Sequence, residues 1–135
     1  MRASHRSRRR GQAMVETALA FTIFLTVVFG LIEFSQAVWT YTLLSHAARA
    51  GTRYASVRGA SSKTPASASD VQTVVKAQAV GLDPNKMTVT VTWLPDNSVG
   101  SPVKVLVKYT FGFLGPYMPA KTIAMQSTSQ VIVSN

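Results

Sequence analysis

One apolar run limits what this chain can fold into. Between Ala13 and Ile32, Glu16 is the only ionisable residue. A run of about twenty such residues is what an α-helix needs to cross a hydrocarbon core of about 30 Å. It therefore predicts one membrane-spanning helix near the front of the 135-residue chain. The remaining length has room for one modest domain and too little for a large enzyme core.

Basic residues gather immediately before that run. Five of the fourteen Lys and Arg residues fall within the first ten positions: Arg2, Arg6, Arg8, Arg9 and Arg10. Without them the formal net charge of +9 falls by five, and the remaining basic residues form no second cluster in the sequence. A basic block beside a spanning helix holds the N-terminus in the cytoplasm. We therefore expect a single-pass membrane protein with an exported C-terminal part, and no nucleic-acid partner.

Helical spacing continues beyond the apolar run. Apolar or small residues recur close to every 3.6 positions, at Phe34, Val38, Tyr41, Leu44, Ala48 and Ala55, and no proline follows until Pro65. This pattern predicts a continuous helix from Gln12 to about Val57. Trp39 and Tyr41 then fall near the outer membrane interface, which amphipathic aromatic rings favour.

A loop and a second helix are expected next. Residues 59–68 are rich in Ser, Thr, Ala and Pro, which is typical of a surface loop. Ser67 and Asp70 have the spacing of a capping box, and Gly81 followed by Pro84 supplies a stop signal. The sequence therefore predicts a helix at about 68–80.

The period then changes to two. Apolar and polar residues alternate over 87–93 and again over 103–113, with turn-forming residues between them, and a third strand is expected at about 122–133. Together these patterns predict an α+β fold: a long N-terminal transmembrane helix, a short helix and a small three-stranded antiparallel sheet.

The junction of leader and apolar run carries the strongest motif, Arg8-Arg9-Arg10-Gly11-Gln12-Ala13-Met14-Val15-Glu16. A glycine that ends a short basic leader, with a glutamate five residues later, resembles a type IV prepilin signal. The resemblance implies that prepilin peptidase cuts after Gly11, so that Gln12 becomes the N-terminus. Glycine permits close approach of a protease. Glu16 would lie about 6 Å along the helix from the new ammonium group, where it can pair with that charge on its own or a neighbouring subunit.

Three segments together resemble the TadE-like family of tight-adherence (Flp) pilus systems. They are 11–16, Phe29-Gly30-Leu31-Ile32-Glu33-Phe34, and 47–55 with its small residues and two arginines. The resemblance covers roughly residues 10–58, and it implies a pilin-like fold and a minor pseudopilin that helps to assemble a type IV pilus or related secretion system. It also implies four partners: prepilin peptidase, other pilins or pseudopilins, the inner-membrane assembly platform and membrane lipid. TadF and TadG share this N-terminal pattern.

Two departures favour a minor subunit over the main filament protein. Thr17 follows Glu16 where the major Flp pilin usually has tyrosine, and this chain is longer than a major Flp pilin.

These patterns divide the chain into four parts. Residues 1–11 are the expected basic leader, 12–33 the transmembrane helix, 34–58 its exported continuation and 59–135 the small α+β domain. Arg49 and Arg53 are four residues apart on one helical face, and the small residues beside them permit close helix contact. We therefore take Glu33, Ala48, Gly51, Arg49 and Arg53 as candidate helix-packing residues.

An ordinary secretory signal peptide is the alternative. Ser35-Gln36-Ala37 supplies a small-x-small cleavage site, and the product would be a secreted or membrane-anchored binding domain that uses its sheet to hold a partner. The long apolar region, Glu33 directly before the site and the helical pattern that continues through it disfavour this reading.

The residue inventory predicts that the chain is not an enzyme and holds no cofactor or metal. Cysteine is absent, and neither His5 nor His46 has a second ligand at metal spacing. The only acidic residues are Glu16, Glu33, Asp70, Asp83 and Asp96, and no nucleophile elbow or phosphate-binding loop accompanies them.

Overall fold

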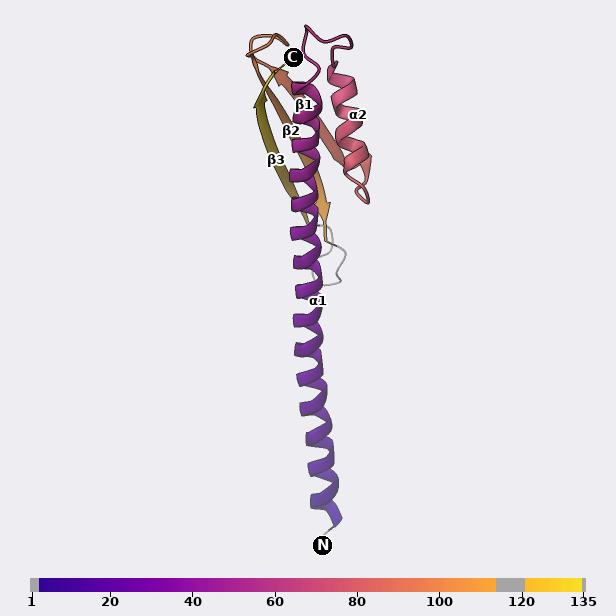
Figure 1. Cartoon of the computed structure of the whole chain (residues 1–135). Coiled ribbons are helices and arrows are strands. Elements are labelled where there is room, and N and C mark those ends of the chain that lie inside the picture. The colour runs from indigo at the N-terminus through magenta and orange to yellow at the C-terminus, as the bar shows by residue number, and fades with distance from the viewer. Residues whose placement is uncertain (1–2, 114–120, 135) are drawn as a thin grey trace. The chain divides into compact units, whose positions relative to one another are not determined.

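The chain divides into two compact units. The computed structural model describes residues 3–113 and 121–134, with the backbone alone for 3–10. The first unit covers residues 1–35 and the second residues 36–135. Helix α1, Ala3–Ser56, begins in the first and ends in the second (Figure 1). The two units are described in turn.

The first unit is the beginning of α1. The helix starts at Ala3, so the described part of the expected leader is helical, upstream of the start predicted at Gln12. From Gly11 onward most of its apolar side chains are exposed, with Met14 75% and Leu31 61% exposed, whereas Leu25 and Val28 are half-buried. None of residues 11–35 is fully buried.

The second unit holds the sheet and a second helix. After the end of α1 come α2 (Ala68–Gln78), the short 3-10 helix η1 (Pro84–Lys86), β1 (Met87–Trp93), β2 (Pro102–Gly112) and β3 (Thr122–Ile132). The strands form one antiparallel sheet in the order β1-β2-β3. The predicted α+β fold is therefore confirmed. Its predicted strands are correct to within one residue, and its short helix ends two residues earlier than predicted.

Local sequence signals explain these elements. The capping box at α2 is present: the Ser67 hydroxyl accepts a hydrogen bond from the Asp70 backbone N–H, and the Asp70 carboxylate accepts one from the Ser67 N–H. Gly81 has a φ of 88°, a left-handed conformation that glycine adopts without steric cost and that turns the chain after α2. In β2 the inward residues Val103, Val105 and Val107 are fully buried.

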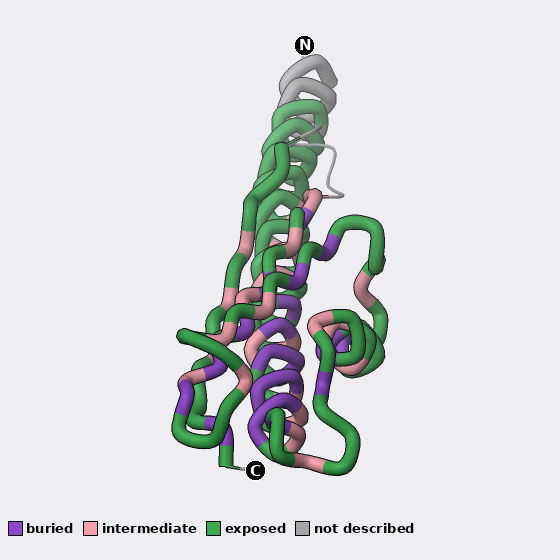
Figure 2. Tube along the Cα trace, turned by 90° about the horizontal axis from the view of Figure 1, so that it is seen from above, coloured by how far each residue is buried: buried purple, intermediate pink, exposed green. Residues whose placement is uncertain are grey.

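Both helices of this unit contribute to one core on one face of the sheet. Figure 2 shows the buried stretch of α1 within this unit. Gly51 marks the closest approach, because a Cβ placed there would lie 2.5 Å from Val75 Cγ2 of α2 and 3.5 Å from Val105 Cγ1 of β2. Thr52 and Ser129 of β3 share a hydrogen bond of 2.9 Å between their hydroxyl oxygens. The packing is therefore close because α1 presents almost no side-chain bulk here.

The buried stripe of α1 differs from the one its apolar spacing predicts. Leu44, Ala48 and Ala55 are buried, but Phe34, Val38 and Tyr41 are exposed. The stripe is completed by small or hydroxyl-bearing residues: Thr40, Ala47, Gly51, Thr52 and Ser56. Only small residues fit here, because α1 lies close to α2 and the sheet. The apolar spacing of the sequence does not reveal this distance.

Candidate functional site

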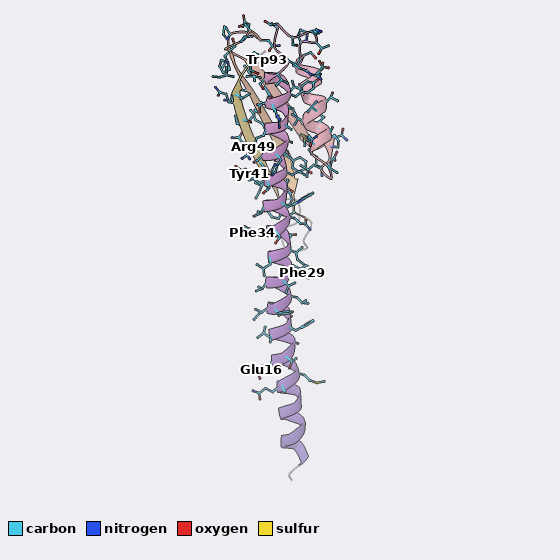
Figure 3. The ribbon with its side chains drawn as sticks, in the orientation of Figure 1. Glu16, Phe29, Phe34, Tyr41, Arg49 and Trp93 are labelled. Carbon is cyan, nitrogen blue, oxygen red and sulfur yellow. The ribbon has the colours of Figure 1, made fainter. Side chains whose placement is uncertain are left out.

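The expected processing and charge-pairing residues lie on the exposed surface of α1. No atom outside the local helix lies within 4 Å of a Cβ placed on Gly11. Gln12 and Glu16 are both exposed. They are at positions i and i+4 of the helix, so their side chains share one helical face. Figure 3 shows Glu16 projecting from the helix near its N-terminal end. Gln12 and Glu16 are thus about one helical turn apart.

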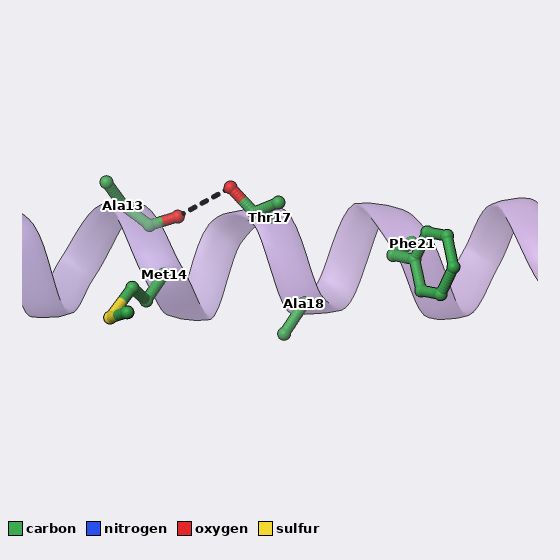
Figure 4. Close-up of a pocket in the computed structure, with 5 residues that line it drawn as sticks. All are labelled: Ala13, Met14, Thr17, Ala18 and Phe21. Atoms are coloured by element: carbon green, nitrogen blue, oxygen red, sulfur yellow. Dashed lines mark hydrogen bonds between the residues drawn. The ribbon is translucent and has the colours of Figure 1, made fainter.

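A shallow, open groove lies on the surface of this part of the helix. It is lined by Ala13, Met14, Thr17, Ala18 and Phe21, all from the same helix (Figure 4). Its hydroxyl is satisfied internally, because Thr17 Oγ1 donates to the Ala13 carbonyl oxygen at 2.8 Å. The groove therefore offers apolar walls, which suit a neighbouring helix or an acyl chain better than a polar substrate.

The other hydroxyl groups of this segment follow the same rule. Thr22, Thr26 and Ser35 each donate to the carbonyl oxygen four residues earlier, at 2.8 to 2.9 Å. Such bonding leaves no unsatisfied hydroxyl donor to be placed in hydrocarbon. Among the described residues, α1 is the helix that is long and apolar enough to cross a membrane, and its most apolar stretch is unburied. This part of α1 fits a membrane anchor.

The five candidate packing residues do not form one site. Ala48 and Gly51 are buried within the second unit's own core. Arg49 and Arg53 are exposed. Glu33 is half-buried, and its Oε1 has no hydrogen-bond partner among the residues that the structure describes.

The acidic residues of the second unit have structural partners. The hydroxyl and backbone N–H of Ser67 hold the pKa of Asp70 below its ordinary value, and the same groups of Ser98 do so for Asp96. Both carboxylates are fixed in turns or caps. Within the described ranges, no group of three or more His, Asp or Glu side chains is placed to hold a metal ion.

Sequence reasoning missed a hollow, which lies where the second unit begins. It encloses about 270 Å³ between three chain segments. Its lining residues are Gln36, Trp39, Thr40, Gly81, Leu82, Lys86, Tyr109, Phe111 and Gly112. Only tertiary packing brings these segments together, so no local sequence pattern could have indicated this hollow.

Comparison with known proteins gives a family match for the front of the chain. Residues 11–53 match the family model described as TadE-like protein. The resemblance predicted from the three sequence segments is therefore confirmed over this range. The match begins at Gly11, includes Glu16 and ends inside the small-residue stretch of α1, so it leaves α2 and the sheet uncovered. No match was found among curated proteins or among solved structures.

Proposed function

We propose, on the premise that residues 11–53 are TadE-like, that this chain is a Tad pilus-associated protein and acts as a minor pseudopilin. In this role it is an assembly subunit of a tight-adherence type IV pilus or a related secretion system. It presents its exported domain on a membrane helix and takes part in no chemical step itself.

The observation that carries the proposal is the difference in exposure along one helix. Most large apolar residues from Met14 to Phe34 are exposed, and Phe34 is 68% exposed. Exposed apolar surface of this extent requires a partner, and lipid or neighbouring apolar helices supply one. A pilin-like subunit meets both in turn: lipid before assembly and other pilins afterward.

Glu16 gives this proposal its chemistry. Cleavage after Gly11 would create an ammonium group on Gln12, one turn from the Glu16 carboxylate. A carboxylate near a helix N-terminus is favourable, but in an apolar environment it is costly unless a positive charge pairs with it. Pairing with the ammonium of a neighbouring subunit would offset that cost and fix the axial register between the two helices.

The proposed topology follows from the same features. The arginine-rich leader stays on the cytoplasmic side of the inner membrane, and the unit from Gln36 onward is exported. The proposed partners are prepilin peptidase, other pilins or pseudopilins, the assembly platform and membrane lipid. No cofactor enters the proposal.

Processing is tested by co-expressing the chain with its prepilin peptidase and measuring the intact mass and the N-terminal peptide. We expect a mature chain that begins at Gln12. Gly11→Val should block cleavage, whereas Gly30→Val, a matched change at another exposed helical glycine, should leave it intact. Cleavage after Ala37 would instead favour the secreted binding domain, and an uncut chain would contradict pseudopilin processing.

The role of Glu16 is tested by Glu16→Ala. The variant should still be cut, because the glycine and the leader are unchanged, but piliated cells should fall about tenfold or more, as expected for about 1.4 kcal/mol lost in pairing. Thr26→Ala, another polar-to-alanine change in the same apolar segment, is the control. Normal piliation by Glu16→Ala would disprove the pairing role.

A further inference from the structure

The hollow at the start of the second unit is formed by the ends of three segments. Gln36, Trp39 and Thr40 come from α1, Gly81 to Lys86 from the link between α2 and β1, and Tyr109 to Gly112 from the end of β2. Gly81 allows the link to pass close to α1, because a Cβ there would lie 3.3 Å from Trp39 Cη2. The fold therefore leaves this space open at a point where chain segments distant in sequence converge.

The lining of this hollow is amphipathic and cationic. Trp39, Tyr109 and Phe111 supply aromatic surface, and Gln36 and Thr40 supply polar groups. Lys86 supplies a positive charge, and no carboxylate is among the lining residues. A ligand that matches these walls has an anionic head and an apolar portion.

The surroundings of the hollow have the same character. Val80, beside Gly81, is 71% exposed, and Ile123, paired with Phe111 in the sheet, is 47% exposed. Lys121 is exposed and is held beside the end of β2 by a hydrogen bond from the Phe113 N–H to its carbonyl oxygen. Asp83, the acidic residue of the link, accepts a hydrogen bond from the Asn85 N–H. Exposed apolar residues next to lysines are typical of a surface that rests on lipid headgroups.

We propose that this hollow binds the headgroup of an anionic phospholipid in the outer leaflet of the membrane that α1 spans. The proposal rests on the membrane anchor proposed above. Gln36 follows Glu33, the expected end of the span, by three residues, or about 5 Å of helix. The lipid phosphate would contact the Lys86 ammonium, and the glycerol and first methylene groups would pack on Trp39, which is 54% exposed. The bound lipid would fix the exported unit close to the membrane surface.

The test uses the full chain in nanodiscs that contain phosphatidylglycerol and phosphatidylcholine in equal amounts. Native mass spectrometry of the released protein then gives the ratio of the two lipids that remain bound. We expect phosphatidylglycerol to be enriched about fivefold, the factor expected for one lysine near an anionic surface. Lys86→Gln should abolish the enrichment, and Lys86→Arg should keep it.

Lys104→Gln is the matched control, because Lys104 is exposed on the sheet face opposite the core. An equal loss of enrichment in Lys104→Gln and Lys86→Gln would show general charge attraction and overturn the proposed site. Absence of enrichment in the wild-type chain would also overturn it. A chain that fails to enter nanodiscs at all would contradict the membrane anchor itself, so the two failures are distinguishable.

Discussion

The two ends of α1 belong to one helix, but their surfaces differ in side-chain size and in burial. In the first unit the helix exposes large residues such as Met14, Phe24 and Leu31. In the second it buries Leu44 among alanines and a glycine, against α2 and the sheet. The first surface is bulky and lacks a partner within its own unit, whereas the second is flat and already fully occupied.

This difference shows where each part of the helix finds its binding energy. A large side chain buries more apolar area than alanine does. The first unit, which exposes large side chains, therefore has the larger capacity for association with lipid or other helices. The small residues of the second unit instead allow α2 and the sheet to pack closely against the helix. Substitutions on the same helix should therefore act on different properties.

The largest expected effect comes from a pair of leucines. Leu44 is fully buried and Leu31 is 61% exposed, so Leu44→Ala should lower the free energy of unfolding of the second unit by about 2–5 kcal/mol. Leu31→Ala should leave it almost unchanged. Urea titration of the full chain in detergent micelles, followed by tryptophan fluorescence, measures both. Similar midpoints for the two variants would show that Leu44 is not part of a cooperative core.

A pair of glycines sharpens the same contrast. A methyl group at Gly51 would lie 2.5 Å from Val75 Cγ2, whereas at Gly30 it would meet nothing within 4 Å. Gly51→Ala should therefore destabilise the second unit by about 1–3 kcal/mol through overpacking, less about 0.5–1 kcal/mol gained from the better helix propensity of alanine. Gly30→Ala should cause no loss in the same urea titration. A higher free energy of unfolding in Gly51→Ala would mean that α2 can shift away from α1 at little cost.

The smallest expected effect is a response to acid, and it is confined to the second unit. Hydrogen bonds from Ser67 lower the pKa of Asp70 from its ordinary value of 3.8, and those from Ser98 act likewise on Asp96. Because the folded-state pKa values are depressed, this stabilisation is present above pH 3.8 and is lost as the pH falls through the folded values. Thermal unfolding between pH 5 and about pH 2 should show a declining Tm.

Ser67→Ala tests the source of that acid response. The variant removes the hydroxyl that donates to Asp70, so its Tm should fall at pH 5 and then decline less steeply with acid than the wild-type Tm. Parallel curves for variant and wild type would assign the acid response to other groups.

Much of the second unit was predictable because its signals are local. The alternation from Met87 to Trp93 and the Ser67–Asp70 capping box each depend on residues close together in the sequence, and both predictions are confirmed. The TadE-like motif was likewise readable as consecutive residues.

What could not be predicted depends on distance between elements. Tyr41 fits the helical period as well as Leu44 does, yet only Leu44 faces α2 and the sheet, because the buried side of α1 is chosen by where those elements pack. The hollow around Lys86 likewise has no local signature, since its walls come from three distant segments. The division into 1–11, 12–33, 34–58 and 59–135 and the roles given to Gly11 and Glu16 stay predictions.

The hydrogen bond between Thr52 and Ser129 joins residues 77 positions apart. Ribosomes add about 5–20 residues per second, so Ser129 is made roughly 4 to 15 s after Thr52. Gly51 meets Val75 of α2 and Val105 of β2, which are made earlier than Ser129. The buried side of α1 can therefore be covered in stages, and its contact with β3 is available only at the end of synthesis.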